Sequence, residues 1–192
     1  MKIYDISQEV LSCCVFPGDP KPEAHILSRM EEGSLYNLSA FSMCAHNGTH
    51  VDAPAHFLQD GKTIDQLPPE QFVGPVFVAR HQGVVTADDA RQILQKAGSV
   101  QRILIRGAAV VSLEAAKVFA EAKLLLLGNE SQTVGPEDAP MAVHKVLLGA
   151  GVVLLEGIRL AHVPEGTFLL CAAPLNLAGL EGAPCRAILI AL

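Results

Sequence analysis

Hydrophobic and polar residues alternate differently in the two parts of this chain. In the first part, short apolar runs at residues 2–6, 24–27 and 38–45 are separated by segments rich in proline and glycine, as is typical of β-strands joined by turns. The turn-rich loop at residues 16–20 is the clearest of these separators, and residues 65–72, with two prolines, indicate a loop and a short helix. The pattern predicts a β-rich N-terminal part.

From residue 75 onward the pattern predicts alternating strands and helices. The expected helices are Ala87–Ala97 behind an N-cap at Thr86, a helix starting at Ser112, and residues 136–148. The expected strands are residues 76–79, 102–106, 124–127, 152–155, 168–172 and 186–191. This order indicates an α/β fold with a βαβα section behind the β-rich part. Because no repeat or linker divides the chain, residues 1–192 are interpreted as a single domain.

The segment from His46 to His56 contains the strongest chemical signal. In an extended segment, residues two apart point to the same face, so the side chains of His50 and Asp52 can bind one ion together. Gly48 permits the sharp backbone path that returns His46 to that ion. Imidazole and carboxylate groups are the usual ligands of catalytic zinc or manganese, so the spacing predicts a metal site.

His56 has a different expected position from the three preceding candidates. Pro54 ends the extended segment and turns the chain before His56. The His56 ring can then approach the same site from another direction, as a general base requires.

Composition restricts the possible partners and compartment. The 192 residues carry a net charge of −6 and are 50% hydrophobic, and no Lys/Arg cluster is present, which argues against a nucleic-acid partner. No apolar run reaches the ~18–20 residues of a membrane span, and no secretory signal pattern occurs at the start. The five cysteines have no Cys-x-x-Cys spacing, which favours a reducing cytoplasm over a disulfide framework.

Two further polar residues are candidate ligands by position. His144 lies within the helix expected at residues 136–148, and Glu156 directly follows the strand expected at 152–155. Open α/β sheets place functional groups at the carboxyl ends of their strands. Position alone leaves both residues open between metal ligands and ordinary half-buried polar residues.

The motif His46-x-Gly-Thr-His50-x-Asp52-x-Pro-x-His56 resembles the signature of the cyclase family of metal-dependent hydrolases. That family includes bacterial kynurenine formamidases and isatin hydrolases. The Phe16-Pro-Gly-Asp-Pro loop and the spacing of His144 and Glu156 are similar to family features as well. The resemblance therefore extends over nearly the whole chain.

The resemblance implies a fold, a ligand set and an assembly. The fold would be a swivelling β/β/α domain, assembled as a homodimer or homotetramer. The cofactor would be zinc, with one or two ions per chain, or manganese. The implied roles are metal ligation by His46, His50, Asp52, His144 and Glu156, with Asp52 bridging two ions, acid/base catalysis by His56, and substrate binding by Phe16.

The chain also departs from the family pattern where substrate would bind. Kynurenine formamidases usually carry tryptophan where Phe16 stands, and the segment after Arg106 lacks their longer aromatic-rich insertion. The first expectation is a hydrolase that cleaves a C–N bond of a small amide, as an arylformamidase does, with a metal-activated water. An isatin hydrolase-like enzyme with one manganese, acting on a cyclic amide or lactone, is the alternative. A non-catalytic metal-binding protein is the third hypothesis.

Overall fold

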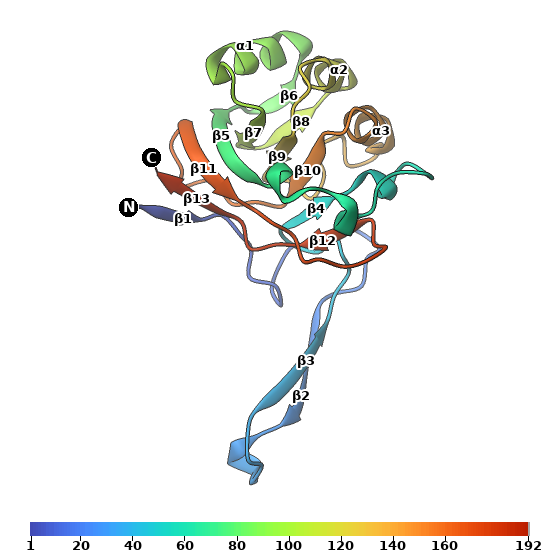
Figure 1. Cartoon of the computed structure of the whole chain (residues 1–192), viewed down its shortest axis with the longest axis vertical. Coiled ribbons are helices and arrows are strands. Elements are labelled where there is room, and N and C mark those ends of the chain that lie inside the picture. Colours follow the sequence, from blue (N-terminus) through green and yellow to red (C-terminus); the bar gives the residue numbers. More distant parts are fainter. Residues whose placement is uncertain (192) are drawn as a thin grey trace.

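The computed structural model describes residues 1–191 and is built around one large sheet (Figure 1). Nine strands of the described chain form this sheet in the order β1-β13-β11-β5-β7-β9-β10-β4-β12. Its strands are β1 (Ile3–Asp5), β4 (His50–Asp52), β5 (Val73–Arg80), β7 (Arg102–Arg106), β9 (Leu126–Asn129), β10 (Val153–Glu156), β11 (Gly166–Cys171), β12 (Gly182–Pro184) and β13 (Ile188–Ala191). The adjacent strands β5, β7, β9 and β10 are parallel, and antiparallel strands extend the sheet on both sides.

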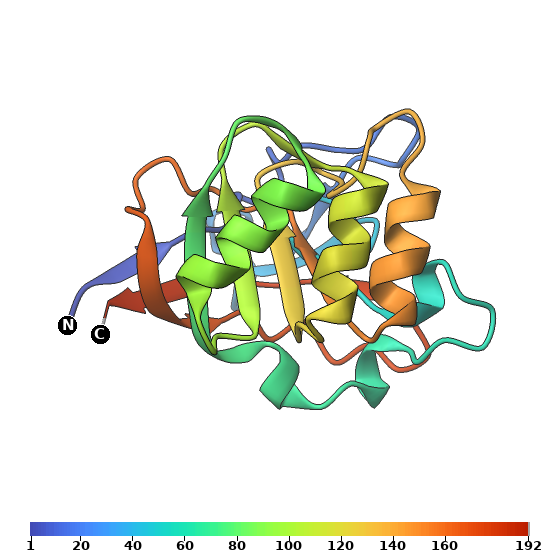
Figure 2. The same ribbon diagram turned by 90° about the horizontal axis from the view of Figure 1, so that it is seen from above.

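Three α-helices of the described chain lie side by side over one face of the sheet (Figure 2). These are α1 (Ala87–Ala97), α2 (Leu113–Glu121) and α3 (Met141–Gly149). One hydrophobic cluster fills the space between the helices and the sheet, and a second covers the opposite face of the sheet. Since the central strands are buried on both faces, they read as nearly continuous apolar runs in the sequence.

The strands β2 (Glu23–Ser28) and β3 (Leu38–Ser42) do not join the large sheet. They pair with each other and project from the body as a long two-stranded arm, with the short 3₁₀ helix Met30–Glu32 near its tip (Figure 1). We call residues 21–43 the arm. Every residue of β3, and all of β2 except the half-buried Ser28, is exposed.

The α/β class predicted from the sequence is confirmed, with corrections to several boundaries. The helix expected at residues 136–148 begins only at Met141. An earlier start would place Pro140 inside the helix, where its ring clashes with the carbonyl of Pro136 and its nitrogen donates no hydrogen bond. Residues 136–139 instead form a turn closed by the Ala139 amide, which donates to the Pro136 carbonyl.

Strand boundaries and short strands also differ from the expectation. The strands expected at 124–127 and 152–155 are Leu126–Asn129 and Val153–Glu156, so Glu156 is the last residue of its strand rather than the residue after it. The strand expected at 38–45 ends at Ser42. Three short strands were not predicted, namely β6 (Gly83–Val85), β8 (Ala109–Val111) and β12. None of the described helices is both long and apolar enough to cross a membrane.

Candidate metal centre and active site

Strand β4 places two of the predicted ligands on one side of the sheet. Its residues alternate as expected, because Val51 enters the hydrophobic core while His50 and Asp52 face away from it and toward each other. The Nε2 atom of His50 lies 3.4 Å from Oδ1 of Asp52. Gly48 has a φ of +63°, the left-handed conformation that glycine adopts readily, and this turn returns His46 to Asp52.

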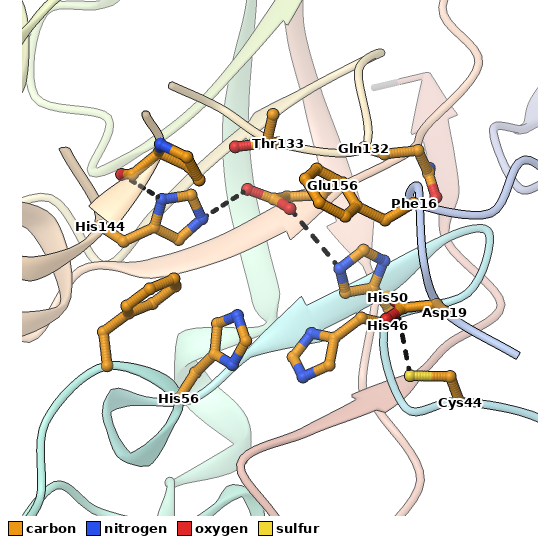
Figure 3. A pocket seen from close by; sticks show the side chains of 12 residues that line it. Phe16, Asp19, Cys44, His46, His50, His56, Gln132, Thr133, His144 and Glu156 are labelled. Atoms are coloured by element: carbon orange, nitrogen blue, oxygen red, sulfur yellow. Dashed lines mark hydrogen bonds and ion pairs between the residues drawn. The ribbon is translucent and has the colours of Figure 1, made fainter. Parts of the chain in front are cut away.

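The neighbouring strand β10 adds Glu156 to the same site. Glu156 lies directly opposite His50 in the antiparallel pair, so both side chains share one face. Nε2 of His50 is 3.5 Å from Oε2 of Glu156. His144 approaches from α3, with Nε2 3.2 Å from Oε1 of Glu156 (Figure 3). The same Nε2 atom lies 3.5 Å from Oδ2 of Asp52.

The structure therefore brings all five predicted ligands together, in two sets that share Asp52. The ligand atoms within each set lie within 4.8 Å of one another, and the sets are His46, His50 and Asp52, and Asp52, His144 and Glu156. The Asp52 side chain is 1% exposed, and within residues 1–191 its Oδ2 atom accepts no hydrogen bond. A buried carboxylate oxygen without a partner is costly unless a cation or donor satisfies it. The donor set fits a divalent metal ion at each position.

Two histidines of the site are oriented by backbone carbonyl groups. His50 places Nδ1 3.0 Å from the Gly48 carbonyl oxygen, and His144 places Nδ1 2.9 Å from the Pro140 carbonyl oxygen. A ring whose Nδ1–H donates to a carbonyl keeps its Nε2 lone pair free for a metal. Both Nε2 atoms face the carboxylates, so each ring directs this nitrogen into the site, where a bound ion would replace its proton.

The carboxylates of the site control the pKa of these histidines in the ion-free protein. Burial lowers the pKa of His50, but the carboxylates of Asp52 and Glu156 outweigh it and raise this pKa to about 10. The pKa of His144 is likewise lowered by burial and raised more strongly by the same two carboxylates, to about 10. Burial raises the pKa of Asp52, yet the surrounding imidazoles lower it well below its ordinary value. The site therefore requires positive charge, which protons supply when no ion is bound.

His56 faces the same centre but has a different environment. It ends the short 3₁₀ helix Pro54–His56, as the turn at Pro54 predicts, and its ring stacks on that of His46 at 4.0 Å between centroids. Within the described chain the His56 ring makes no hydrogen bond, whereas the other three histidines of the cluster do. Burial lowers the pKa of His56; the carboxylates of Asp52 and Glu156 oppose this shift and nearby imidazoles add to it, so that the pKa remains lowered. A neutral ring with free nitrogens is suited to accept a proton.

A cavity of about 210 Å³ opens above these residues. Phe16, the residue predicted to bind substrate, lies in the lining of this cavity (Figure 3). The N-terminal loop also contributes Asp19, whose carboxylate accepts a long hydrogen bond of 3.7 Å from the thiol of Cys44. Gln132 and Thr133 form another part of the wall.

The sequence interpretation missed several residues of this site. The atoms Gln132 Oε1 and Thr133 Oγ1 are buried and make no hydrogen bond within residues 1–191. Both side chains line the cavity. Glu181 places Oε1 3.2 Å from Nε2 of His46. These residues lie in loops with no distinctive spacing, so no signal in the sequence marks them. Cys44 also lines the cavity.

Fold and site together define an α/β protein with two sets of metal ligands that share Asp52 and lie beside a cavity. The chain belongs to the cyclase family, since the family model described as putative cyclase matches residues 4–136. The family predicted from the histidine motif is confirmed.

Relatives and solved structures of this family match nearly the whole chain. A kynurenine formamidase of Salinibacter ruber is 34% identical, with 98% of this chain and 97% of that protein covered. A kynurenine formamidase of Erythrobacter litoralis is 31% identical, with 98% and 93% covered. The solved structure of a predicted metal-dependent hydrolase from Bacillus stearothermophilus is 27% identical, covers 98% of this chain and 97% of its own, and has a TM-score of 0.82. Isatin hydrolase A from Labrenzia aggregata, at 21% identity, shares the fold with a TM-score of 0.84 over 98% of this chain and 93% of its own.

Proposed function

We propose that this protein is a metal-dependent hydrolase of the formamidase type, which cleaves the C–N bond of a small, non-peptide amide within one domain spanning residues 1–192. The observation that carries the proposal is the buried Asp52 carboxylate, which belongs to two ligand sets at once. Two kynurenine formamidases align with this protein over nearly the whole chain. The substrate is accordingly a small molecule.

The ligand residues form two proposed metal sites. His46, His50 and Asp52 would hold one divalent ion, and Asp52, His144 and Glu156 a second, with zinc as the proposed metal. Bound there, such ions lower the pKa of water toward ~7 and polarise a carbonyl group. The Val134 amide donates to Oε1 of Glu156 at 2.8 Å, which fixes the carboxylate that faces both His50 and His144.

His56 moves the proton in the proposed reaction. The neutral ring accepts a proton from the attacking water as the water oxygen bonds to the carbonyl carbon. It then returns this proton to the amide nitrogen as the C–N bond breaks, so that an amine and a carboxylic acid leave. The lowered pKa of His56 keeps the ring neutral before attack.

The cavity wall supplies substrate contacts. Phe16 offers an apolar surface to an aromatic or aliphatic substituent, and the unpaired atoms of Gln132 and Thr133 offer hydrogen bonds to a polar one. An amide with a flat apolar part and a polar side group satisfies both. The protein is proposed to act in the cytoplasm, since its five described cysteines are free thiols. The family resemblance implies that it assembles as a homodimer or homotetramer.

A second candidate is an isatin hydrolase-like enzyme that opens a cyclic amide or lactone with one manganese. The observation that favours it is the His46, His50 and Asp52 set, which is a complete three-ligand site without His144 and Glu156. A non-catalytic metal-binding protein is disfavoured, because the half-buried His56 ring lines the cavity beside the ligand cluster and belongs to neither ligand set.

Metal content separates the two enzymes. The experiment is elemental analysis of protein purified without added metal, for wild type and His144→Ala, followed by activity assays with N-formyl aromatic amines and with cyclic amides and lactones. The binuclear formamidase is supported by about two ions in wild type and about one in the variant, together with hydrolysis of the formyl amines. About one ion in both proteins, with ring opening, supports the alternative, and no metal in either contradicts both.

A further inference from the structure

The third histidine ligand of the site, His46, differs from the other two in the hydrogen bond of its outer nitrogen, the one that faces away from the shared carboxylate. His50 and His144 direct Nδ1 at a backbone carbonyl oxygen and Nε2 at the ligand carboxylates. His46 is reversed, because its Nδ1 lies 2.8 Å from Oδ1 of Asp52 and its Nε2 lies 3.2 Å from Oε1 of Glu181. Within residues 1–191 the Glu181 carboxylate is the one hydrogen-bond partner of this Nε2 atom.

Neighbouring rings restrict how the His46 ring can lie. It stacks on the His56 ring with 4.0 Å between centroids and 25° between the ring planes, and the His50 ring meets it edge-on at 5.1 Å. A ring held in this plane can still turn over by 180°, which exchanges each nitrogen atom for a carbon atom. Turning over would place carbon atoms against both carboxylates and remove both hydrogen bonds. Asp52 and Glu181 together therefore select the observed orientation.

Backbone hydrogen bonds hold the segment that carries Glu181. The Ala53 amide donates to the Glu181 carbonyl at 2.8 Å. The next residue, Gly182, pairs with Asp52 where β12 lies beside β4. The strand that carries the ligand Asp52 thus also fixes the backbone from which the Glu181 side chain extends.

Gly182 leaves the space that the His46 ring occupies. A Cβ atom at this position would lie 2.8 Å from Cε1 of His46 and 2.9 Å from the Val51 carbonyl oxygen. Both separations are shorter than the ~3.5–4.0 Å of an ordinary contact. Because the Val51 carbonyl belongs to the sheet, the ring would have to move, and Cε1 is bonded to both ring nitrogens. Glycine at this position therefore allows the ring to reach Asp52 and Glu181 at once.

A metal ion can bind Nδ1 of His46 only through the lone pair of that nitrogen. In a neutral imidazole one nitrogen carries the proton and the other carries the lone pair, so Nδ1 is available when the proton is on Nε2. A carboxylate that accepts the Nε2–H stabilises this tautomer, as carboxylate partners of metal-ligating histidines commonly do. A charged acceptor also forms a stronger hydrogen bond than the backbone carbonyl groups at His50 and His144.

We infer that Glu181 is a positioning residue for metal binding, which accepts the Nε2–H of His46 and so leaves the Nδ1 lone pair for the ion. The inference rests on the proposed metal site, and Glu181 itself belongs to neither ligand set. Its side chain is 40% exposed. Attraction between partly exposed charges contributes little, so the effect of Glu181 depends on the hydrogen bond rather than on its charge.

The first measurement is zinc affinity, by competition with a coloured chelator. Glu181→Ala is expected to weaken the binding of one zinc ion by about 10-fold, the lower end of the ~10–100-fold range for such partners, because water reaches the exposed carboxylate. Glu181→Gln is expected to weaken it by less, since its amide oxygen still accepts the hydrogen bond. Glu121→Gln, at the exposed end of α2, is the control for loss of one negative charge and should leave the affinity unchanged.

A double-mutant cycle separates an effect through the His46 ring from a general effect of Glu181. His46→Ala removes the ring, so adding Glu181→Ala to it should cause no further loss of zinc affinity. An equal loss in both backgrounds would mean that Glu181 acts through its charge or through the fold of β12, and would overturn the inference. Circular dichroism checks that every variant is folded.

Nitrogen NMR of the zinc-loaded protein tests the tautomer directly, with the His46 signals assigned by their absence from His46→Ala. In wild type, Nδ1 is expected to bind zinc, and the proton on Nε2 is expected to exchange more slowly with solvent than in Glu181→Ala. A zinc bond through Nε2 in wild type, or unchanged affinity and proton exchange in Glu181→Ala, contradicts the inference. If wild type binds no zinc, the proposed metal site is wrong as well, whereas bound zinc without turnover contradicts only the proposed reaction.

Discussion

The metal-ligand cluster and the arm place polar and apolar side chains in opposite ways. In the cluster, ionisable groups such as Asp52, His50 and Glu156 are buried at 1–2% exposure. In the arm, Phe41 and Ile26 are apolar and half exposed or more. Buried charge is costly unless a counter-charge is present, and exposed apolar surface is costly unless it is covered. Each region is therefore incomplete in the single chain, one requiring an ion and the other requiring a protein surface.

The largest expected difference between the two regions is in turnover. His56→Ala is expected to lower kcat by roughly 10²–10⁴-fold, because the proton acceptor is lost. Metal content should stay at the wild-type value, since His56 belongs to neither ligand set. Ile26→Glu in the arm is expected to change kcat far less. Steady-state kinetics and elemental analysis of both variants make the comparison, and loss of metal from His56→Ala would mean that His56 is a ligand instead of a base.

A second difference is expected in stability. Leu155 in β10 is fully buried beneath the site, and Leu35 near the arm tip is 93% exposed. Leu155→Ala should lower the free energy of unfolding by about 2–5 kcal/mol through lost burial and a cavity. Leu35→Ala should change it by less than ~0.5 kcal/mol. Urea denaturation under conditions where the protein is monomeric measures the change in the free energy of unfolding for both variants. A loss for Leu35→Ala as large as that expected for Leu155→Ala would show that the arm folds as part of the core.

The two regions were also unequally predictable from the sequence. The segment from His46 to His56 forms its part of the site through local geometry, namely strand alternation, the left-handed turn at Gly48 and the turn at Pro54, so its arrangement follows from spacing alone. His144 and Glu156 required the family resemblance. They meet Asp52 only because α3 and β10 pack beside β4, a tertiary contact that spacing does not encode.

Other features depended entirely on tertiary structure. Glu181 reaches His46 through pairing of β12 with β4, two strands far apart in the sequence, and β12 has no strand pattern of its own. Strands at residues 24–27 and 38–45 were expected, but their departure from the sheet was not, because alternation predicts a strand without showing what covers it. The late start of α3 could have been predicted from Pro140, because proline is disfavoured inside a helix. The apolar pattern of residues 136–148 instead led to the prediction of a longer helix.

Removal of metal is expected to change the cluster and leave the arm unaffected. With free zinc at about 100 times its dissociation constant, binding stabilises the folded state by about 2.7 kcal/mol. Chelation should therefore lower the melting temperature and increase hydrogen exchange in β4 and β10, while exchange in β2 and β3 should not change. Calorimetry and hydrogen exchange with and without chelator measure these effects. An unchanged melting temperature would contradict a metal held by buried ligands.

The smallest expected signal is a release of protons when metal binds. With the pKa of both His50 and His144 at about 10, each ring is protonated in the ion-free protein at pH 8. A metal binds only the unprotonated nitrogen, so binding should release about two protons per chain at that pH. The competition with protons strengthens as pH falls and disappears above about pH 10, so apparent metal affinity should rise with pH through this interval. Calorimetric titration with zinc in buffers of different ionisation enthalpy gives the number of protons. Release close to zero would mean that the carboxylates do not hold these imidazoles protonated, and that the charge required by the buried cluster is supplied in another way.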